Sequence, residues 1–240
     1  MSNYNIEKDD ICNLTSLIKS DTNLRLLDAG CGDGIFTKEL VSLGYNVVGL
    51  DNSKESLELF KKNNPNIPFI EANLLTFNTK QPFDIIFSNS CFHLIERKDQ
   101  HMLAVRLNKA LKQNGELVFE FEGYNSSSKV HKTLERIFNE NGLLYKNDYY
   151  LPTIREHANV LEDHGFLITD AMLYSKFMKI KKGLRYWIES NIKKAFDIVP
   201  IDLKEEIIEE ALDRLKNELF IDNEWYIDTV RIRMRAIKIK

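Results

Sequence analysis

The amino-acid sequence predicts an α/β domain in which a mostly parallel sheet of seven strands is covered by helices on both faces. Short apolar segments alternate with amphipathic segments through the first half of the chain, a pattern typical of parallel strands joined by crossover helices. A glycine-rich turn between residues 30 and 34 joins the first strand to the first helix. Apolar and charged residues alternate strictly in Val230–Ala236, which indicates a further strand at the end of the chain.

Five of the strands lie in the first half of the chain, and each is a short apolar run bounded by turn residues. They cover residues 24–29, 46–50, 69–70, 83–87 and 116–121. The first predicted helix covers about residues 34–43 and ends at Gly44, which is a suitable C-cap. The second helix begins at a cap on Asn52 or Ser53, and the third covers about residues 99–111.

The second half of the chain carries two strands and several helices. We expect helices at residues 127–141 and 157–164, strands at 166–174 and 230–236, and a mainly helical region at 181–220. Asp202 and Glu205 have the spacing of a capping box at the start of the clearest helix in that region. The last strand is placed beside the preceding one, and the helices between them form a cap.

This organisation predicts a single domain over residues 1–240. Its sheet-bearing core covers about residues 1–123, 151–175 and 225–240, and its helical cap covers about residues 124–150 and 176–224. The cap is therefore inserted into the core near the C-terminus.

Composition and charge restrict the class of partner. The net charge of −3 at pH 7 does not favour a nucleic-acid groove, and no apolar run is long enough to span a bilayer. The N-terminus is acidic and polar, unlike a signal peptide. Cys12, Cys31 and Cys91 show neither metal-ligand spacing nor a disulfide framework, which fits a reducing cytoplasm. We therefore expect a cytoplasmic monomer or homodimer that acts on a small molecule, without nucleic acid, membrane or metal.

The glycine turn is suited to a nucleotide-like ligand, and two cofactor classes compete for it. A dinucleotide site needs the spacing G-x-G-x-x-G, but Gly30, Gly32 and Gly34 follow G-x-G-x-G, and no basic residue in the turn is placed for a phosphate. Asp51 ends the second strand, where a carboxylate can accept hydrogen bonds from both hydroxyls of a ribose. A ligand with a ribose and no phosphate therefore fits better, and a nicotinamide-dependent oxidoreductase is disfavoured.

In their order and spacing, the motifs of the first half resemble those of the class I S-adenosylmethionine-dependent methyltransferases, a family with a Rossmann-like fold. The matching segments are Leu27–Gly34, Val48–Asp51, Glu71–Leu74, Phe83–Ser90 and Leu111–Leu117. The resemblance implies that S-adenosylmethionine is the cofactor. The cofactor-binding residues that it implies are Asp28, Gly30, Cys31, Gly32, Asp51, Asn52, Asn73, Leu74 and Asn89.

Three features depart from the family pattern. Asn73 stands where an aspartate is usual, although its side-chain oxygen can still accept a hydrogen bond from an adenine amino group. Leu94 stands where a tryptophan is common, and the segment before Leu24 is short for a flap over the cofactor. Two residues keep a structural alternative: Asp28 can contact the cofactor or brace the turn, and Asn89 can contact the cofactor or only turn the chain.

Motifs in the second half are similar to the trans-aconitate methyltransferase-like branch of that family. They are Phe119–Gly123, Tyr150–Thr153, Leu161–Phe166, Gly183–Ile188 and Trp225–Met234. By this resemblance the protein methylates a small molecule. In-line displacement onto an oxygen of a small carboxylic acid is one expected reaction, and a hydroxyl or amine acceptor, for which His93 would be the base, is the other. A non-catalytic cofactor-binding or regulatory protein is the alternative.

Candidate residues for the acceptor side come from several segments. His93 follows the fourth strand at the carboxyl edge of the sheet, as a candidate general base or a pocket-wall residue. Arg185, whose fork can bind a carboxylate, Trp187 and Tyr150 are candidate substrate contacts. The alternatives are a surface ion pair for the arginine and core packing for the aromatic residues. The three arginines of Val230–Ala236 are expected to keep an edge strand soluble rather than to bind an anion.

Overall fold

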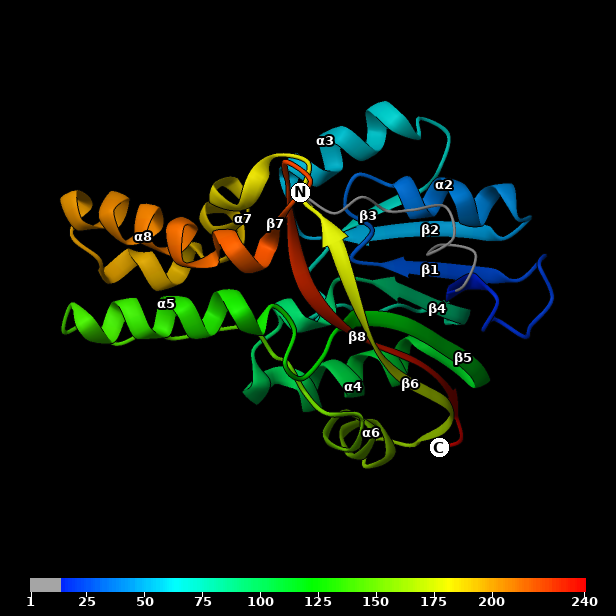
Figure 1. The fold of residues 1–240 in the computed structure, drawn as a ribbon. Helices are drawn as coiled ribbons and strands as arrows, with labels where there is room; N and C mark the ends of the chain where they lie inside the picture. Colours follow the sequence, from blue (N-terminus) through cyan, green and yellow to red (C-terminus); the bar gives the residue numbers. More distant parts are fainter. Residues whose placement is uncertain (1–13) are drawn as a thin grey trace.

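Figure 1 shows the computed structural model of the protein, which describes residues 14–240. In these residues the sheet has the strand order β3-β2-β1-β4-β5-β8-β6, and the two-residue β7 (Phe220–Ile221) pairs with β8 outside this order. The expected α/β fold with a mostly parallel sheet is confirmed. The expectations about the polar N-terminus, Cys12 and the first part of the segment before Leu24 fall on residues outside the described range.

The first half of the chain builds the parallel part of the sheet. Its strands are β1 (Arg25–Ala29), β2 (Asn46–Asp51), β3 (Phe69–Glu71), β4 (Phe83–Asn89) and β5 (Leu111–Glu122). Its helices are α2 (Ile35–Ser42), α3 (Lys54–Asn63) and α4 (Gln100–Ala110), with two short 3-10 segments, η1 (Phe92–Leu94) and η2 (Arg97–Asp99). The register pairs Asp28 with Gly49 and Asp51 with Glu71, so the carboxyl ends of β1, β2 and β3 lie at one edge.

Each face of the sheet carries its own hydrophobic cluster, because adjacent residues of a strand point to opposite faces. On one face, Leu27 belongs to a buried cluster with Leu107 of α4 and with residues of α6 (Ile154–Glu162). On the other face, Leu26 belongs to a cluster with Leu40 of α2. Helices therefore cover both faces of the parallel part, as the alternating sequence pattern predicts.

The last strand lies inside the sheet. β8 (Glu224–Lys238) runs between β5 and β6 (Phe166–Lys179) and is antiparallel to both, so its predicted place beside β6 is confirmed. The prediction that its arginines keep an edge strand soluble is wrong. Arg231 and Arg233 are buried, and both pair with Glu120 of β5. The alternating charges of this strand arise from ion pairs within the sheet.

The cap consists of helices from two separate parts of the chain. They are α5 (Ser128–Glu140), α7 (Gly183–Asn191) and α8 (Ile201–Leu219), with the 3-10 segment η3 (Lys193–Ile198). These helices share a further cluster of buried apolar side chains. Figure 1 shows α5 and α8 side by side beyond the end of the sheet to which the parallel strands point. The cap therefore lies next to the edge that carries the predicted site residues.

Two helix starts differ from the prediction. α8 begins directly after Pro200 without a side-chain cap, and the predicted capping box at Asp202 falls within its first turn. Proline suits the start of a helix because no hydrogen bond from its nitrogen is needed there. A capping box is found instead at α6, where Thr153 Oγ1 accepts from Glu156 N and the Glu156 carboxylate accepts from Thr153 N. The helix predicted from residue 157 therefore starts earlier.

Candidate cofactor and acceptor site

The glycine turn after β1 is held against the end of β2. The backbone N–H groups of Gly30 and Cys31 donate to the carbonyl oxygen of Leu50 at 2.7 and 3.0 Å. Gly30 and Gly32 have φ angles of 77° and 55°, in the left-handed region that glycine adopts without strain. A Cβ atom at Gly30 would overlap the side chain of Cys91, whereas one at Gly32 would meet no atom of residues 14–240 within 4 Å. The turn is closed by protein at Gly30 and open at Gly32.

The carboxylate of Asp51 is oriented by two backbone N–H groups at the end of β2. Gly32 N donates to Oδ2 at 3.0 Å, and Ser53 N donates to Oδ1 at 2.9 Å. Each carboxylate oxygen has further acceptor capacity, and the side chain is only half-buried. Two oriented acceptors beside the open part of the turn fit the two hydroxyls of a ribose.

Asp28 lies deeper in the same region and makes a different contact. Its side chain is buried, and its Oδ2 accepts a hydrogen bond from Thr37 Oγ1 at 2.6 Å. Burial raises the pKa of this carboxyl to about 7; the Thr37 hydrogen bond opposes this shift, and the charge of Asp51 adds to it. Burial also raises the pKa of the neighbouring Cys31 thiol. The geometry supports the alternative in which Asp28 braces the turn by joining β1 to α2.

The residues predicted to contact the adenosine part of the cofactor lie at the ends of β2 and β3. Asn52 is exposed, and of the two predicted caps of α3 it is Ser53 whose Oγ accepts a hydrogen bond from the helix. Asn73 is also exposed, and its Oδ1 accepts from Leu75 N at 2.8 Å. Leu74 beside it is buried. An adenine contact by Asn73 would therefore use the remaining lone pair of this oxygen or the side-chain N–H groups.

The loop after β4 lies next to the glycine turn. Ser90 has a φ angle of 55°, and its backbone N–H donates to the carbonyl oxygen of Glu120 at 2.7 Å. Asn89 Oδ1 accepts a hydrogen bond from Arg231 of β8 at 2.9 Å. Sequence reasoning missed this arginine as a neighbour of the site. Its alternating pattern is visible in the sequence, but its carboxylate partner Glu120 lies 111 positions earlier.

His93 is buried in the 3-10 segment that follows this loop. Its ring stacks on Phe121 with 6.5 Å between centroids and meets Tyr149 edge-on at 5.4 Å. Burial lowers the pKa of His93 to about 4; the charge of Glu122 opposes this shift, and that of Arg231 adds to it. Among the described residues its Nδ1 has no hydrogen-bond partner. The ring is therefore neutral at pH 7 and a weak base.

The three predicted substrate contacts lie in different environments. Arg185 of α7 pairs with Glu205 at 2.8 Å and with Glu209, both on α8. Trp187 is buried in the cap cluster, and Tyr150 is buried in the cluster of the sheet. These positions match the alternatives of a surface ion pair for Arg185 and of core packing for Trp187 in the cap and Tyr150 beside the sheet. A role of these residues in substrate binding stays a prediction.

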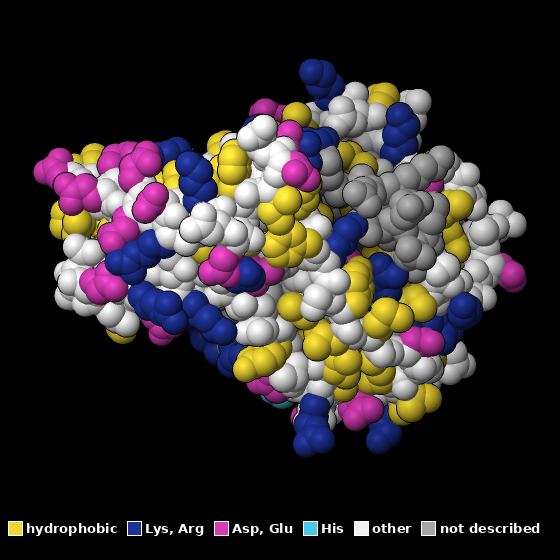
Figure 2. Space-filling view, in the orientation of Figure 1, with side chains coloured by type: hydrophobic (Ala, Val, Ile, Leu, Met, Phe, Trp, Pro, Cys, Tyr) yellow, Lys and Arg dark blue, Asp and Glu magenta, His cyan; other side chains and the backbone are white. Residues whose placement is uncertain are grey.

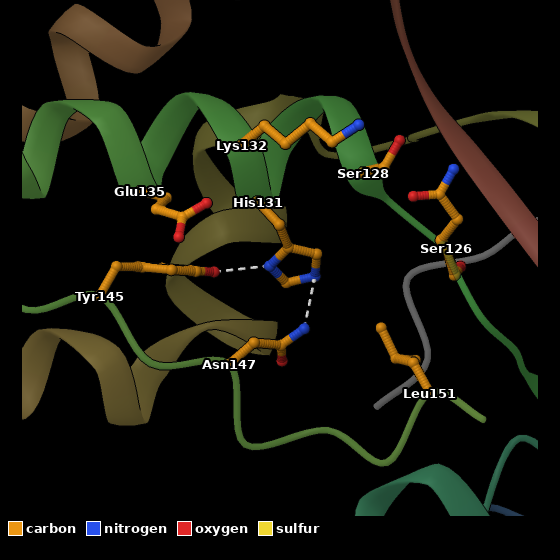
Figure 3. Close-up of a pocket in the computed structure, with 9 residues that line it drawn as sticks. Ser126, Ser128, His131, Lys132, Glu135, Tyr145, Asn147 and Leu151 are labelled. Carbon is orange, nitrogen blue, oxygen red and sulfur yellow. Dashed lines mark hydrogen bonds between the residues drawn. The ribbon is translucent and has the colours of Figure 1, made fainter.

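A cavity of about 270 Å³ lies between the start of α5 and the loop that follows this helix (Figure 3). It is lined by Asn125, Ser126, Ser128, His131, Lys132, Glu135, Tyr145, Asn147 and Leu151. His131 projects from α5, with its Nδ1 hydrogen-bonded to Tyr145 OH at 2.5 Å and its Nε2 3.4 Å from Asn147 Nδ2. Burial lowers the pKa of His131 to about 4 and raises that of Tyr145. The Ser126 hydroxyl donates to Glu122 Oε2 at 2.9 Å, so the cavity adjoins the end of β5.

Sequence reasoning does not find this cavity. The run Asn125–Ser128 is visible only as a polar turn before a helix. His131 and Tyr145 are 14 positions apart and belong to no motif. They meet because the chain reverses after α5 at Asn141 and Gly142, where Gly142 has a φ angle of 68°. The sequence signals the end of the helix there, but not which side chains the returning loop brings against it.

Neither a metal centre nor a membrane span is found in the part of the chain that the structure describes. Over residues 14–240, no group of three or more His, Cys, Asp or Glu side chains is arranged to hold a metal ion. Over the same range, no helix combines the length and apolar character needed to cross a membrane.

Comparison with known proteins finds methyltransferases. A family model described as a methyltransferase domain matches residues 26–115. An uncharacterised methyltransferase of Schizosaccharomyces pombe is 27% identical over 241 residues, which cover 95% of this chain and 91% of that protein. The malonyl-[acyl-carrier protein] O-methyltransferase of Buchnera aphidicola is 30% identical over 188 residues, which cover 75% of this chain and 74% of that protein.

A further relative and a solved structure agree with this result. The trans-aconitate 2-methyltransferase of an Enterobacter species is 29% identical over 154 residues, which cover 63% of this chain and 60% of that protein. The crystal structure of the YcgJ protein of Bacillus subtilis has the same fold, with a TM-score of 0.67 at 16% identity. The alignment covers 98% of this chain and 100% of that one.

Proposed function

This chain belongs to the class I S-adenosylmethionine-dependent methyltransferases, and on this premise we propose that it methylates a carboxylate oxygen of a small acid. The observation that carries the cofactor part of the proposal is the carboxylate of Asp51, whose two oxygens are both oriented by backbone N–H groups beside the turn at Gly32. We assign the ribose hydroxyls of the cofactor to Asp51 and the adenine ring to the neighbourhood of Asn73 and Leu74. When bound, S-adenosylmethionine supplies a methyl group that is electrophilic because it is attached to a positively charged sulfur.

A carboxylate is the acceptor that this site favours. It is ionised at pH 7, so no proton has to be removed before the new carbon–oxygen bond forms. The candidate base His93 has a pKa of about 4, which suits a neutral wall of the pocket better than a general base. By their names, the relatives from Buchnera and Enterobacter act on malonyl-[acyl-carrier protein] and on trans-aconitate, which both carry carboxyl groups. Positioning and exclusion of water, which supply about 7–11 kcal/mol in well-oriented systems, then suffice as the protein's contribution.

We assign the acceptor to the cavity at the start of α5. Its volume of about 270 Å³ is close to the lower end of the range for small-molecule sites and suits a small acid. The Lys132 ammonium can pair with an anionic group, and the Ser126 and Ser128 hydroxyls can donate hydrogen bonds. The hydrogen bond from Ser126 to Glu122 joins this cavity to the end of β5.

The proposal is tested by binding and by the chemical nature of the product. Calorimetry with S-adenosylmethionine and with S-adenosylhomocysteine should show binding of both, and Asp51→Ala serves as the negative control. Small dicarboxylates and tricarboxylates are then screened with methyl-labelled cofactor. A methyl ester releases labelled methanol in mild base, whereas a methyl ether or methylamine does not. A base-stable product would rule out the carboxylate acceptor, and absence of binding of both cofactor forms would rule out the cofactor site.

His93 provides a second test of the acceptor. Loss of a general base typically slows a reaction by about 10²–10⁴-fold. We expect the turnover of His93→Asn at saturating cofactor to stay within about fivefold of the wild type, since a carboxylate acceptor needs no base. A hundredfold loss with unchanged cofactor affinity would instead assign His93 as the base for a hydroxyl or amine acceptor.

A further inference from the structure

Arg231 of β8 connects three parts of the chain that are distant in sequence. Its Nε donates to Glu120 Oε1 at 3.1 Å, while its Nη2 donates to Asn89 Oδ1 at 2.9 Å and to Ser90 Oγ at 2.7 Å. Only 7% of its side chain is exposed. The guanidinium group presents donors in a rigid planar fork, so it can bind the β5 carboxylate and the loop after β4 at the same time.

The loop that Arg231 contacts has a backbone conformation that its sequence does not favour. Ser90 has a φ angle of 55°, in the left-handed region that is unfavourable for a residue with a Cβ atom. The backbone of β5 holds one side of this residue, because Ser90 N donates to the Glu120 carbonyl oxygen at 2.7 Å. Arg231 holds the other side through the Asn89 and Ser90 side chains. The surrounding contacts, rather than local preference, therefore maintain the loop.

The same loop forms the closed side of the glycine turn. A Cβ atom at Gly30 would overlap the Cys91 side chain, which shows how tightly the loop packs on the turn. The preceding residue of β4, Ser88, donates from its hydroxyl to the Ala29 carbonyl oxygen at 2.7 Å. Beyond Gly30, the backbone N–H of Gly32 orients the Asp51 carboxylate. A displacement of the loop would therefore reach the groups assigned to the cofactor.

We propose that Arg231 is a positioning residue that acts on the cofactor site through the Asn89–Cys91 loop. From the antiparallel strand β8 it holds this loop against the glycine turn and so preserves the arrangement of Gly30, Gly32 and Asp51. The proposal rests on the assignment of the cofactor to this turn. The hydrogen bonds described above join Arg231 to Glu120, Asn89 and Ser90, so its proposed effect on the glycine turn and on Asp51 is indirect.

A second arginine of the same strand face provides a matched control. Arg235 donates from Nε to Glu116 Oε2 at 3.1 Å and has 13% of its side chain exposed. Its hydrogen bonds go to β5 and β6 and not to the loop after β4. Without Arg231, Glu120 still accepts from Arg233 and Tyr174. Without Arg235, Glu116 still accepts from Ser20 and from Lys19 N. The two substitutions thus differ in their effect on the loop.

The experiment compares Arg231→Met with Arg235→Met by calorimetry with S-adenosylhomocysteine, alongside urea denaturation of both variants. We expect both to lose stability, but only Arg231→Met to lose affinity, by about tenfold, which equals about 1.4 kcal/mol. Arg235→Met should stay within about twofold of the wild type, a difference that corresponds to less than 0.5 kcal/mol by the same relation. Equal affinities of the two variants would overturn the proposal.

Relief of the backbone strain gives an independent readout. Glycine adopts positive φ without a penalty, so Ser90→Gly should make the loop less dependent on Arg231. We expect Arg231→Met/Ser90→Gly to regain a several-fold part of the lost affinity, and absence of any recovery would contradict the role of the loop. If Arg231→Met does not fold, Arg231→Lys replaces it, because one ammonium cannot bridge Glu120 and the loop as the fork does. If the wild type itself does not bind S-adenosylhomocysteine, the proposed function fails, and this outcome is distinct from equal binding by the variants.

Discussion

Two aspartates at neighbouring strand ends show how the environment of a single residue decides its role. Asp51 is half-buried, and both of its oxygens accept backbone hydrogen bonds while keeping room for a ligand. Asp28 is buried, its Oδ2 accepts a hydrogen bond from the Thr37 hydroxyl, and burial raises its pKa to about 7. The sequence places both residues at the carboxyl ends of neighbouring strands, and the structure has them there. Their different exposure supports the proposal that Asp51 binds the ribose and that Asp28 braces the turn.

The first prediction concerns Asp51. A hydrogen bond to a charged group contributes about 1.5–3 kcal/mol, and a ribose offers two hydroxyls to this carboxylate. We therefore expect Asp51→Ala to weaken the binding of S-adenosylhomocysteine by at least about tenfold in calorimetry. Asp84→Ala is the control, because Asp84 accepts from Arg25 N at the opposite end of the sheet. Unchanged affinity of Asp51→Ala would show that the ribose is bound elsewhere.

At the scale of elements, strand β8 depends on buried charges. Glu120 of β5 accepts from Arg231, Arg233 and Tyr174, and all of these contacts lie on one face of the β5–β8–β6 sheet. In its sequence pattern, β8 resembles a half-exposed edge strand, since every second residue from 231 to 235 is an arginine. It is nevertheless an interior strand, because the carboxylates of β5 compensate the arginines. The pairing partner, rather than the alternation, decides where the strand lies.

The second prediction tests this compensation. Removing one partner of a buried ion pair typically costs about 3–5 kcal/mol, because the other charge stays buried without its counterion. We expect Glu120→Gln to lower the free energy of unfolding by about 3 kcal/mol in urea denaturation. Glu224→Gln is the matched control: its pair with Lys179 is exposed at the surface, and such pairs contribute about 0–1 kcal/mol. Similar losses for the two variants would show that the buried pairs do not hold β8 in place.

At the scale of the whole molecule, the space-filling view in Figure 2 shows charged side chains concentrated on the cap at one end and yellow apolar patches over the sheet. The edge strand β6 carries exposed apolar residues, among them Met172, Leu173 and Phe177. Two histidines, His93 in the segment after β4 and His157 in α6, are buried, and His131 in the cap is half-buried. Their burial couples the stability of the fold to pH.

The third prediction concerns this pH dependence. Burial lowers the pKa of His157 from 6.5 to about 3, so the folded protein keeps this ring neutral where the unfolded chain binds a proton. The contribution of the neutral His157 ring to the free energy of unfolding is therefore complete above pH 6.5. It decreases as the pH falls from 6.5 toward 3. The loss is about 1.4 kcal/mol for each pH unit below 6.5. His93 and His131 act in the same direction.

The contribution of His157 is isolated by comparing the pH dependence of the stability of a His157 variant with that of the wild type. Asp28, whose pKa is raised in the folded state, acts in the opposite direction over this range, but it contributes equally to both proteins that are compared. His157 lies among the rings of Phe119 and Phe121, and both of its nitrogens lack partners among the described residues, so phenylalanine can replace it. We expect the stability of His157→Phe relative to the wild type to rise as the pH falls from 7 to about 5 in urea denaturation. A difference that does not change with pH would contradict the neutral, buried state of His157.

The sequence by itself determined the parallel half of the fold and the cofactor edge. Hydrophobic periodicity, glycine spacing and the position of Asp51 are local properties that can be read from the sequence. Because strands alternate with helices, the strands are parallel and their carboxyl ends lie at the same edge of the sheet. The tertiary structure alone decided the interior position of β8, the contact of Arg231 with the loop after β4, and the cavity beside His131. Arg231 and Glu120 are 111 positions apart, and such contacts depend on strand register and helix packing, which no local pattern encodes. For the same reason only packing could show that Arg185 is engaged in ion pairs on the cap.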